Sequence, residues 1–161
     1  MTQVETERKF IIEKPLALNG LEYADIEQIY LTAARGTRRV RMMKTGDVKK
    51  YYFTEKIRRS ALSALETERE IDEKTYLLLL KEADKSRNPV QKRRYYYPFK
   101  QWMFEIDIYP FWQKQCVLEV ELQSEKEEIC FPPDIKIIKE VSLEKEYKNF
   151  ALAKKVPAEL I

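Results

Sequence analysis

The dominant pattern along the chain is an alternation of apolar and polar residues with a period of two. Eight segments show it, most of them rich in β-branched or aromatic residues and separated by turn or loop residues, as is typical of β-strands. The expected strands are 4–12, 24–31, 37–43, 49–56, 65–71, 90–97, 102–109 and 116–122. Many antiparallel strands with few helices predict a single α+β domain over residues 1–161, and a barrel is the expected architecture.

Helical signals interrupt the strands in three places. Asp72 is a candidate N-cap for the first helix. Ser124 followed three residues later by Glu127 has the capping-box pattern. Glu144 and Lys148 are four residues apart, a spacing that supports a helix near the end of the chain. The three expected helices are 73 to about 85, 124–130 and 143–155.

The strands also show which face each side chain takes, because residues two apart on a strand share a face. Glu119 and Glu121 lie on one face of their strand, whereas Leu118, Val120 and Leu122 lie on the other. For one strand, the charged face would simply be the solvated side of a half-buried sheet. The same separation recurs on strand after strand, and in a closed sheet one face becomes the lumen.

A lumen lined by charges of both signs is costly unless those charges pair, bind metal or bind a polyanion. Acidic residues on one wall and Lys or Arg residues on another would hold divalent cations and phosphates together. The pattern therefore favours a charged binding site inside the barrel over a merely solvated sheet face.

Composition narrows the chemistry of such a site. Charged residues make up 35% of the chain, but 30 basic residues nearly cancel 27 acidic ones, which argues against a plain nucleic-acid binder. The absence of histidine removes Ser-His and Cys-His catalysis and the usual zinc sites, so any metal should be a hard cation such as Mg²⁺ or Mn²⁺. With only three glycines there is no glycine-rich phosphate loop, so side chains must hold any phosphates.

Location and partners follow from what the sequence does not contain. It shows no signal-peptide pattern and no apolar run of membrane length. Cys116 and Cys130 make a poor disulfide framework. We expect a cytoplasmic protein with a small-molecule partner, no nucleic-acid or membrane partner, and a homodimer as an open alternative.

Eight short motifs follow one another between residue 4 and about residue 152. They are Glu5-x-Glu7-x-Lys9, Arg39-x-Arg41, Thr54-x-Lys56, Glu66-x-Glu68, Lys92-x-Arg94, Asp107 before an aromatic residue, Glu119-x-Glu121, and Glu140-Val141-Ser142 with Tyr147 and Asn149. In this order they resemble the motifs of the CYTH domain, or triphosphate tunnel metalloenzyme, superfamily. The resemblance implies an eight-stranded antiparallel tunnel with helices packed outside, and action on triphosphate groups with Mg²⁺ or Mn²⁺.

The resemblance also implies roles for individual residues. Glu5 and Glu7 are expected to bind a divalent cation together with Glu121, and Glu119 and Asp107 are further candidate ligands. The residues expected to bind phosphate are Lys9, Arg39, Arg41, Lys56, Lys92 and Arg94. A second metal ion or a carboxylate, Glu66 or Glu68, is expected to activate the attacking water, with Lys9 also at the catalytic centre and Glu140 in support.

Three positions depart from the family pattern. Ser142 replaces the usual threonine but keeps the hydroxyl group, and Ile29 replaces a glycine. Ala64 replaces an arginine that often precedes the middle acidic motif, a loss for which Arg58 or Arg59 could compensate. These departures bear on substrate preference more than on catalytic competence.

The leading hypothesis is hydrolysis of inorganic triphosphate or a short polyphosphate. Alternatives are a class IV-type adenylyl cyclase, a thiamine triphosphatase and a non-catalytic binder of polyphosphate or nucleotide. The cyclase is disfavoured because no clear adenine pocket is visible: Tyr51, Tyr95 and Tyr97 are expected to pack on the outer sheet face rather than stack a base. The complete set of acidic residues argues against the silent binder.

Overall fold

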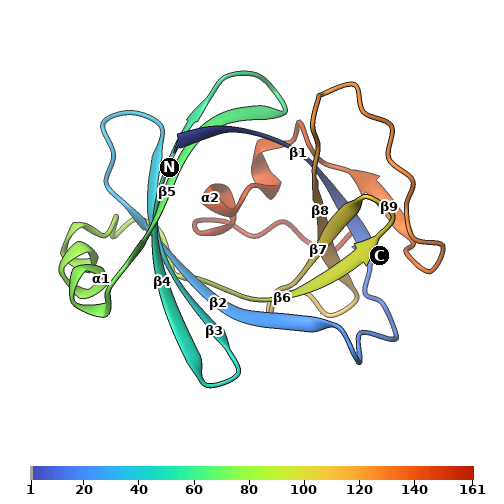
Figure 1. The fold of residues 1–161 in the computed structure, drawn as a ribbon, viewed down its shortest axis with the longest axis horizontal. Coiled ribbons are helices and arrows are strands. Elements are labelled where there is room, and N and C mark those ends of the chain that lie inside the picture. The colour runs from blue at the N-terminus through green and yellow to red at the C-terminus, as the bar shows by residue number, and fades with distance from the viewer. Residues whose placement is uncertain (1) are drawn as a thin grey trace.

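Nine strands form one continuous antiparallel sheet in the computed structural model, which describes residues 2–161. The strands are β1 (Thr2–Glu13), β2 (Glu22–Leu31), β3 (Thr37–Thr45), β4 (Val48–Arg58), β5 (Ser63–Ile71), β6 (Val90–Phe99), β7 (Trp102–Ile108), β8 (Gln115–Glu121) and β9 (Ile137–Glu140). Their order is β5-β4-β3-β2-β6-β7-β8-β1-β9, and β5 also pairs with β1. The first eight strands therefore close into a barrel (Figure 1), as predicted.

Closure depends on β1, which changes partners along its length. Residues 2–6 pair with β5, whereas residues 7–13 pair with β8. The last part of β1 also pairs with β9, which adds a short ninth strand outside the eight. The acidic segment from Glu5 to Lys9 thus lies at the seam of the barrel, between β5 and β8.

Two apolar clusters cover the outer side of the barrel wall. In one cluster, Phe104, Ile106 and Leu118 have no exposed surface and pack beneath the loop that carries Ile129 and Phe131. In the other, strand residues of β2 to β5 pack beneath the first helix. Tyr95 and Tyr97 belong to the first cluster and Tyr51 to the second, so the prediction that they face outward is confirmed.

The first helix, α1 (Glu73–Leu79), begins where the sequence indicates. The Asp72 carboxylate accepts a hydrogen bond from the Thr75 backbone N–H at 2.7 Å, which confirms the N-cap. A 3-10 turn, η1 (Leu80–Glu82), ends the segment slightly before the expected residue 85. Figure 1 shows α1 on the outside of the barrel. No helix within residues 2–161 is long and apolar enough to cross a membrane.

The predicted helix at 124–130 is wrong, since this segment is an irregular loop. The Glu127 carboxylate accepts hydrogen bonds from the Gln123 backbone N–H and from the Trp102 indole N–H, which ties the loop to the barrel. The chain then runs on without helical structure, and Ile129 and Phe131 cover the outer apolar cluster. Tertiary packing therefore overrides the local capping signal.

The predicted helix at 143–155 is divided into two short pieces, η2 (Lys145–Tyr147) and α2 (Asn149–Leu152). The break is Lys148, whose backbone is extended with φ −72° and ψ 145°. It lets Tyr147 and Leu152 both enter an apolar cluster with the inward-facing Ile11 of β1. In the view of Figure 1, α2 lies within the ring of strands, so this segment closes one end of the lumen rather than packing outside the wall.

Leu118→Ala should test the position of the outer core. Leu118 is completely buried against the loop, so truncation should lower the free energy of unfolding by about 2–5 kcal/mol in urea. The matched control is Leu143→Ala, because Leu143 is 69% exposed and should change stability by no more than about 0.5 kcal/mol. Equal effects of the two substitutions would contradict the assignment of the core.

Candidate active site

The inward faces of the strands surround a cavity of about 210 Å³ inside the barrel. Its carboxylate-bearing lining residues are Glu5, Glu7, Glu66, Glu68, Glu105, Glu119 and Glu121, and its cationic ones are Arg39, Arg41, Lys56, Lys92 and Arg94. Gln3, Gln28 and Asn149 complete the lining. The cavity thus brings together most of the residues that the sequence predicts for the site, and nearly all of its lining is charged.

Asp107 lies behind the basic wall and does not line the cavity. It is fully buried, and its carboxylate accepts hydrogen bonds from Arg94 Nε at 2.8 Å, Arg94 Nη2 at 2.9 Å and Lys92 Nζ at 2.8 Å. Burial opposes its ionisation, but Arg94 and Lys92 outweigh this and lower the pKa of Asp107. Asp107 thus fixes the two cations that it contacts, and its expected role as a metal ligand stays a prediction.

The basic wall is formed by β3 and β6, whose cations have different surroundings. Burial lowers the pKa of Lys92 to about 8, although Asp107 acts to keep the ammonium charged. Arg94 also pairs with Glu105 at 3.1 Å, and Arg41 pairs with Glu68. These contacts hold the cationic groups in fixed positions around the cavity.

The acidic wall contains two carboxyl pairs, Glu7 with Glu119 and Glu5 with Glu66. Burial, and then the neighbouring Glu119, raises the pKa of Glu7 to about 8. Burial, and then Glu5, raises the pKa of Glu66 to about 7. The pKa values of Glu5 and Glu119 are lowered despite burial, since nearby lysines stabilise their charges. Each pair therefore has one carboxyl group that holds its proton up to about neutral pH beside one carboxylate, and Glu7 holds it more firmly than Glu66 does.

Two lysines neutralise the remaining charge on this wall. Lys56 Nζ lies 2.7 Å from Glu5 Oε1 and 3.4 Å from Glu66 Oε2. Lys9 Nζ lies 3.3 Å from Glu119 Oε1 and donates to the Tyr147 carbonyl at 3.1 Å. Among residues 2–161, no three acidic side chains already converge as a closed cation cage. A divalent cation bound here would therefore replace shared protons and lysine contacts.

Several buried polar atoms of the lumen have no hydrogen-bond partner within residues 2–161. Arg39 Nε, Arg41 Nε, Thr54 Oγ1 and both amide atoms of Gln28 belong to the adjacent strands β2, β3 and β4. On the acidic wall, Glu66 Oε2 and Glu119 Oε1 accept no hydrogen bond within residues 2–161 and are contacted by Lys56 and Lys9 at 3.4 and 3.3 Å. Buried polar groups are normally hydrogen-bonded. Mainly donors lack a partner on one wall, and acceptors lack a hydrogen bond on the other. This arrangement fits a phosphate bound to the first wall and a hard cation bound to the second.

Glu140 lies outside the lumen, where it supports β1. It accepts two hydrogen bonds from Arg8, at 2.8 and 2.6 Å, and one from the Ser142 hydroxyl at 2.7 Å. Ser142 in turn accepts from the Lys9 backbone N–H at 2.9 Å. The serine hydroxyl thus links β1 to the end of β9. Arg58, one of the two arginines that could compensate for Ala64, is an exposed residue at the end of β4.

Four lining residues had no role assigned from the sequence: Gln3, Gln28, Glu105 and Asn149, the last of which was named only as part of the closing motif. Gln28 is fully buried on an otherwise apolar strand face, and a lone amide in that position is a usable signal. Glu105 is two residues before Asp107 and so shares its face. Asn149 reaches the lumen only because the chain breaks at Lys148, which nothing local in the sequence indicates.

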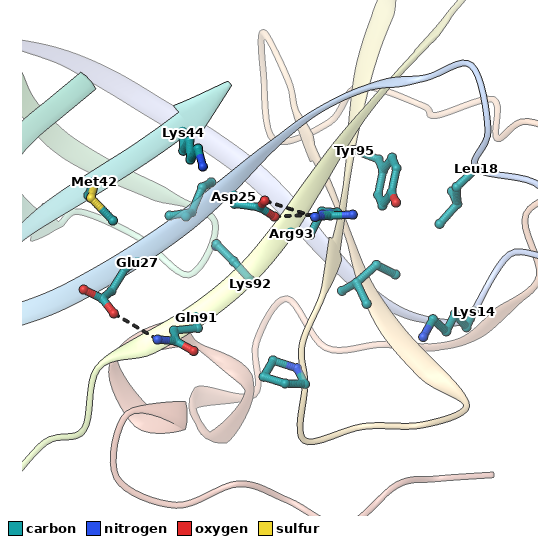
Figure 2. Close-up of a pocket in the computed structure, with 13 residues that line it drawn as sticks. Lys14, Leu18, Asp25, Glu27, Met42, Lys44, Gln91, Lys92, Arg93 and Tyr95 are labelled. Carbon is teal, nitrogen blue, oxygen red and sulfur yellow. Dashed lines mark hydrogen bonds and ion pairs between the residues drawn. The ribbon is translucent and has the colours of Figure 1, made fainter. Parts of the chain in front are cut away.

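A larger hollow, of about 550 Å³, lies on the outer face of β2 and β6 (Figure 2). Leu18 and Tyr95 contribute to its lining, and four of its charged residues, Asp25, Glu27, Lys92 and Arg93, already have partners (Figure 2). Arg93 pairs with Asp25 at 2.7 and 3.0 Å, and Gln91 donates to Glu27 at 3.0 Å. We therefore assign the candidate site to the charged lumen, where orphaned donors and acceptors face one cavity.

The closed eight-stranded wall and its charged lumen agree with the tunnel fold that the motifs predict. The inorganic triphosphatase NE1496 is similar to this chain, with 28% identity and a TM-score of 0.58 over 96% of this chain and 97% of that one. The PH1819 protein from Pyrococcus horikoshii shares the fold at 20% identity, with a TM-score of 0.59 over 76% of this chain and 80% of that one.

A third structure with this fold is a putative adenylyl cyclase from Hippeastrum, HpAC1, described as having a dominant triphosphatase activity. It is 15% identical, with a TM-score of 0.54 over 74% of this chain and 80% of that one. No protein-family model matches the chain, and no curated protein matches its sequence. The similarity to known proteins is therefore found by comparing structures, and it confirms the fold expected from the motifs.

The two carboxyl pairs should make stability depend on pH in chelator-treated protein. Unfolding frees Glu7 and Glu66 to ionise near pH 4.5, below their folded pKa values of about 8 and 7. The folded protein thus binds more protons in this window, so its stability should fall as the pH rises from about 5 to 8. We expect a loss of about 1–3 kcal/mol between pH 5.5 and 8.0, measured by urea unfolding with EDTA.

Glu7→Gln should flatten this dependence, because the amide keeps the shape of the protonated acid and cannot ionise. Glu13→Gln is the matched control, since Glu13 is an exposed acid on the same strand. Equal slopes in the wild type and in Glu7→Gln would show that Glu7 does not hold the proton.

Proposed function

We propose that this protein is a divalent-metal-dependent triphosphatase, and that inorganic triphosphate or a short linear polyphosphate is its preferred substrate. The observation that carries the proposal is the division of the lumen into a basic and an acidic wall: buried donors on the first lack hydrogen-bond partners, and carboxylates on the second are contacted by lysines. Similarity to the inorganic triphosphatase NE1496 over nearly the whole chain supports it.

The basic wall would bind the phosphate oxygens. Arg39, Arg41 and Arg94 offer planar forks suited to oxyanions, while Lys92 and Lys56 supply compact charges. Asp107 holds Arg94 and Lys92 in place, so little rearrangement is required when substrate binds. Positioning and charge neutralisation of this kind provide most of the rate enhancement in phosphoryl transfer.

The acidic wall would hold the metal. Glu5, Glu7, Glu119 and Glu121 provide oxygen ligands, which Mg²⁺ and Mn²⁺ prefer. Such a cation, when bound, neutralises phosphate charge and lowers the pKa of bound water. Lys9 and Lys56 balance the carboxylates and would move toward phosphate oxygens as the cation replaces them.

Glu66 is better placed than Glu68 to accept a proton from the attacking water. Its pKa of about 7 lies near the working pH, as suits a general base. Glu68, in contrast, is engaged by Arg41. The Glu66 carboxyl also faces Lys56 at 3.4 Å, which would stabilise its ionised form during the reaction.

The composition of the lumen disfavours the nucleotide alternatives. The cavity of about 210 Å³ is lined by charged and amide side chains, with no aromatic or aliphatic residue that would receive an adenine or a thiazolium ring. A linear phosphate chain needs no such surface. We therefore rank inorganic substrates above ATP and thiamine triphosphate.

The test is to compare turnover of tripolyphosphate, ATP and thiamine triphosphate with Mg²⁺ and with Mn²⁺, and to identify the products. Tripolyphosphate should be hydrolysed fastest, to orthophosphate and pyrophosphate, and only when a divalent cation is present. Formation of cyclic AMP as the main product from ATP would overturn the proposal.

The variant that accompanies this assay is Glu5→Gln. It removes a carboxylate from the acidic wall and should lower metal-dependent kcat/KM by roughly 100-fold or more, while the far-UV spectrum stays unchanged. Glu13→Gln, with an exposed acid on the same strand, should retain nearly full activity. Normal turnover in Glu5→Gln would mean that the metal site has been misassigned.

A further inference from the structure

A second, smaller cavity of about 80 Å³ adjoins the lumen at its closed end. It lies where the C-terminal segment meets β3 and β4, and Asn149 lines both cavities. The volume exceeds the space of one water molecule several-fold. The end of the lumen is therefore not completely filled by the apolar cluster.

The lining of this cavity is strongly basic. Its cations are Lys9, Arg39, Lys56, Arg58 and Lys148, and Glu7 is its one carboxyl group. Lys9 and Lys56 are paired with carboxylates of the lumen. The side chains of Arg58 and Lys148 make no hydrogen bond or ion pair within residues 2–161, although both line the same cavity. Arg58 and Lys148 therefore bring positive charge that no ion pair within residues 2–161 offsets, and Glu7 is the one carboxyl group that lines the cavity beside them.

Lys148 is directed here by the backbone break between η2 and α2. Burial and the nearby charges of Arg58 and Lys9 lower its pKa to about 8. Like charges held together destabilise the folded protein unless an anion compensates them. Asn149 adds a neutral donor, since its Oδ1 atom accepts from the Tyr109 hydroxyl and its amide N–H groups stay available.

We propose that Arg58 and Lys148, together with the Asn149 amide, form a second oxyanion site that takes one phosphoryl group beyond those bound in the lumen. The ligand is either the fourth phosphoryl group of a linear tetraphosphate or a free orthophosphate. This inference rests on the proposed function only in that the lumen binds the first three groups. With such a site, the closed end of the lumen would recognise the length of a phosphate chain rather than a nucleoside.

The test measures binding by calorimetry in chelator-treated protein, so that turnover cannot interfere. Tripolyphosphate and tetrapolyphosphate are titrated separately, and orthophosphate is titrated into protein saturated with tripolyphosphate and into protein alone. The variants are Lys148→Gln, Arg58→Gln and the double substitution. Lys154→Gln is the control, because Lys154 is an exposed lysine of the same segment that does not line the cavity.

If the site takes a fourth phosphoryl group, the wild type should bind tetrapolyphosphate about 5–10-fold tighter than tripolyphosphate. The double variant should lose that ratio, and Lys154→Gln should keep it. If the site takes free phosphate, orthophosphate should bind the saturated wild type and not the saturated double variant. Thermal stability should stay the same or rise in the double variant, since a like-charge contact is removed.

The proposal is overturned if the double variant retains both the preference for tetrapolyphosphate and the binding of orthophosphate, or if the wild type shows neither. The failure of the proposed function gives a different result. In that case the wild type would not bind tripolyphosphate, while orthophosphate binding to the protein alone would still fall in the double variant.

Discussion

Closure of the sheet through β1 is the constraint on which the rest of the structure depends. Because β1 pairs with β5 along its first half and with β8 along its second, the charged faces of most barrel strands are turned into one lumen. The apolar faces must then be covered from outside, by α1 on one side and by the loop containing Ile129 and Phe131 on the other. The main hydrophobic packing therefore surrounds the site instead of filling it.

This arrangement concentrates opposite charges where water is scarce, which is costly unless each charge is compensated. The protein compensates them in three ways: Asp107 is held between two cations, lysines contact carboxylates, and carboxyl pairs share protons. The compensation is incomplete, as the orphaned atoms of Gln28, Arg39 and Arg41 show. A phosphate chain with a divalent cation would supply partners for the charged groups of both walls at once. The uncompensated charges that destabilise the folded protein therefore favour binding of its proposed ligand.

The strands and their faces could be predicted because two-residue alternation is a local property, and closure then places those faces inside. The order of the charged motifs predicted the tunnel fold and most of the residues that line the lumen. Features that depend on tertiary contacts could not be predicted. Strand β9 forms by pairing with β1, and the Glu127 carboxylate accepts a hydrogen bond from the Trp102 indole instead of capping a helix. The backbone break at Lys148 lets residues on both sides of it pack at the closed end of the lumen. The contacts of Asp107 with Lys92 and Arg94 could not be predicted either, because spacing gives the face of a strand but not which neighbour contacts the carboxylate.

Proton release on metal binding tests the central claim most directly, namely that paired carboxyl groups in the lumen form the cation site. Mn²⁺ should be titrated into the protein at pH 7 in two buffers of different ionisation enthalpy. The account predicts release of about one proton or more per bound ion, since Glu7 and Glu66 retain protons near this pH, and a smaller release in Glu7→Gln. Mn²⁺ binding with no proton exchange, or with the same release in Glu7→Gln, would contradict it.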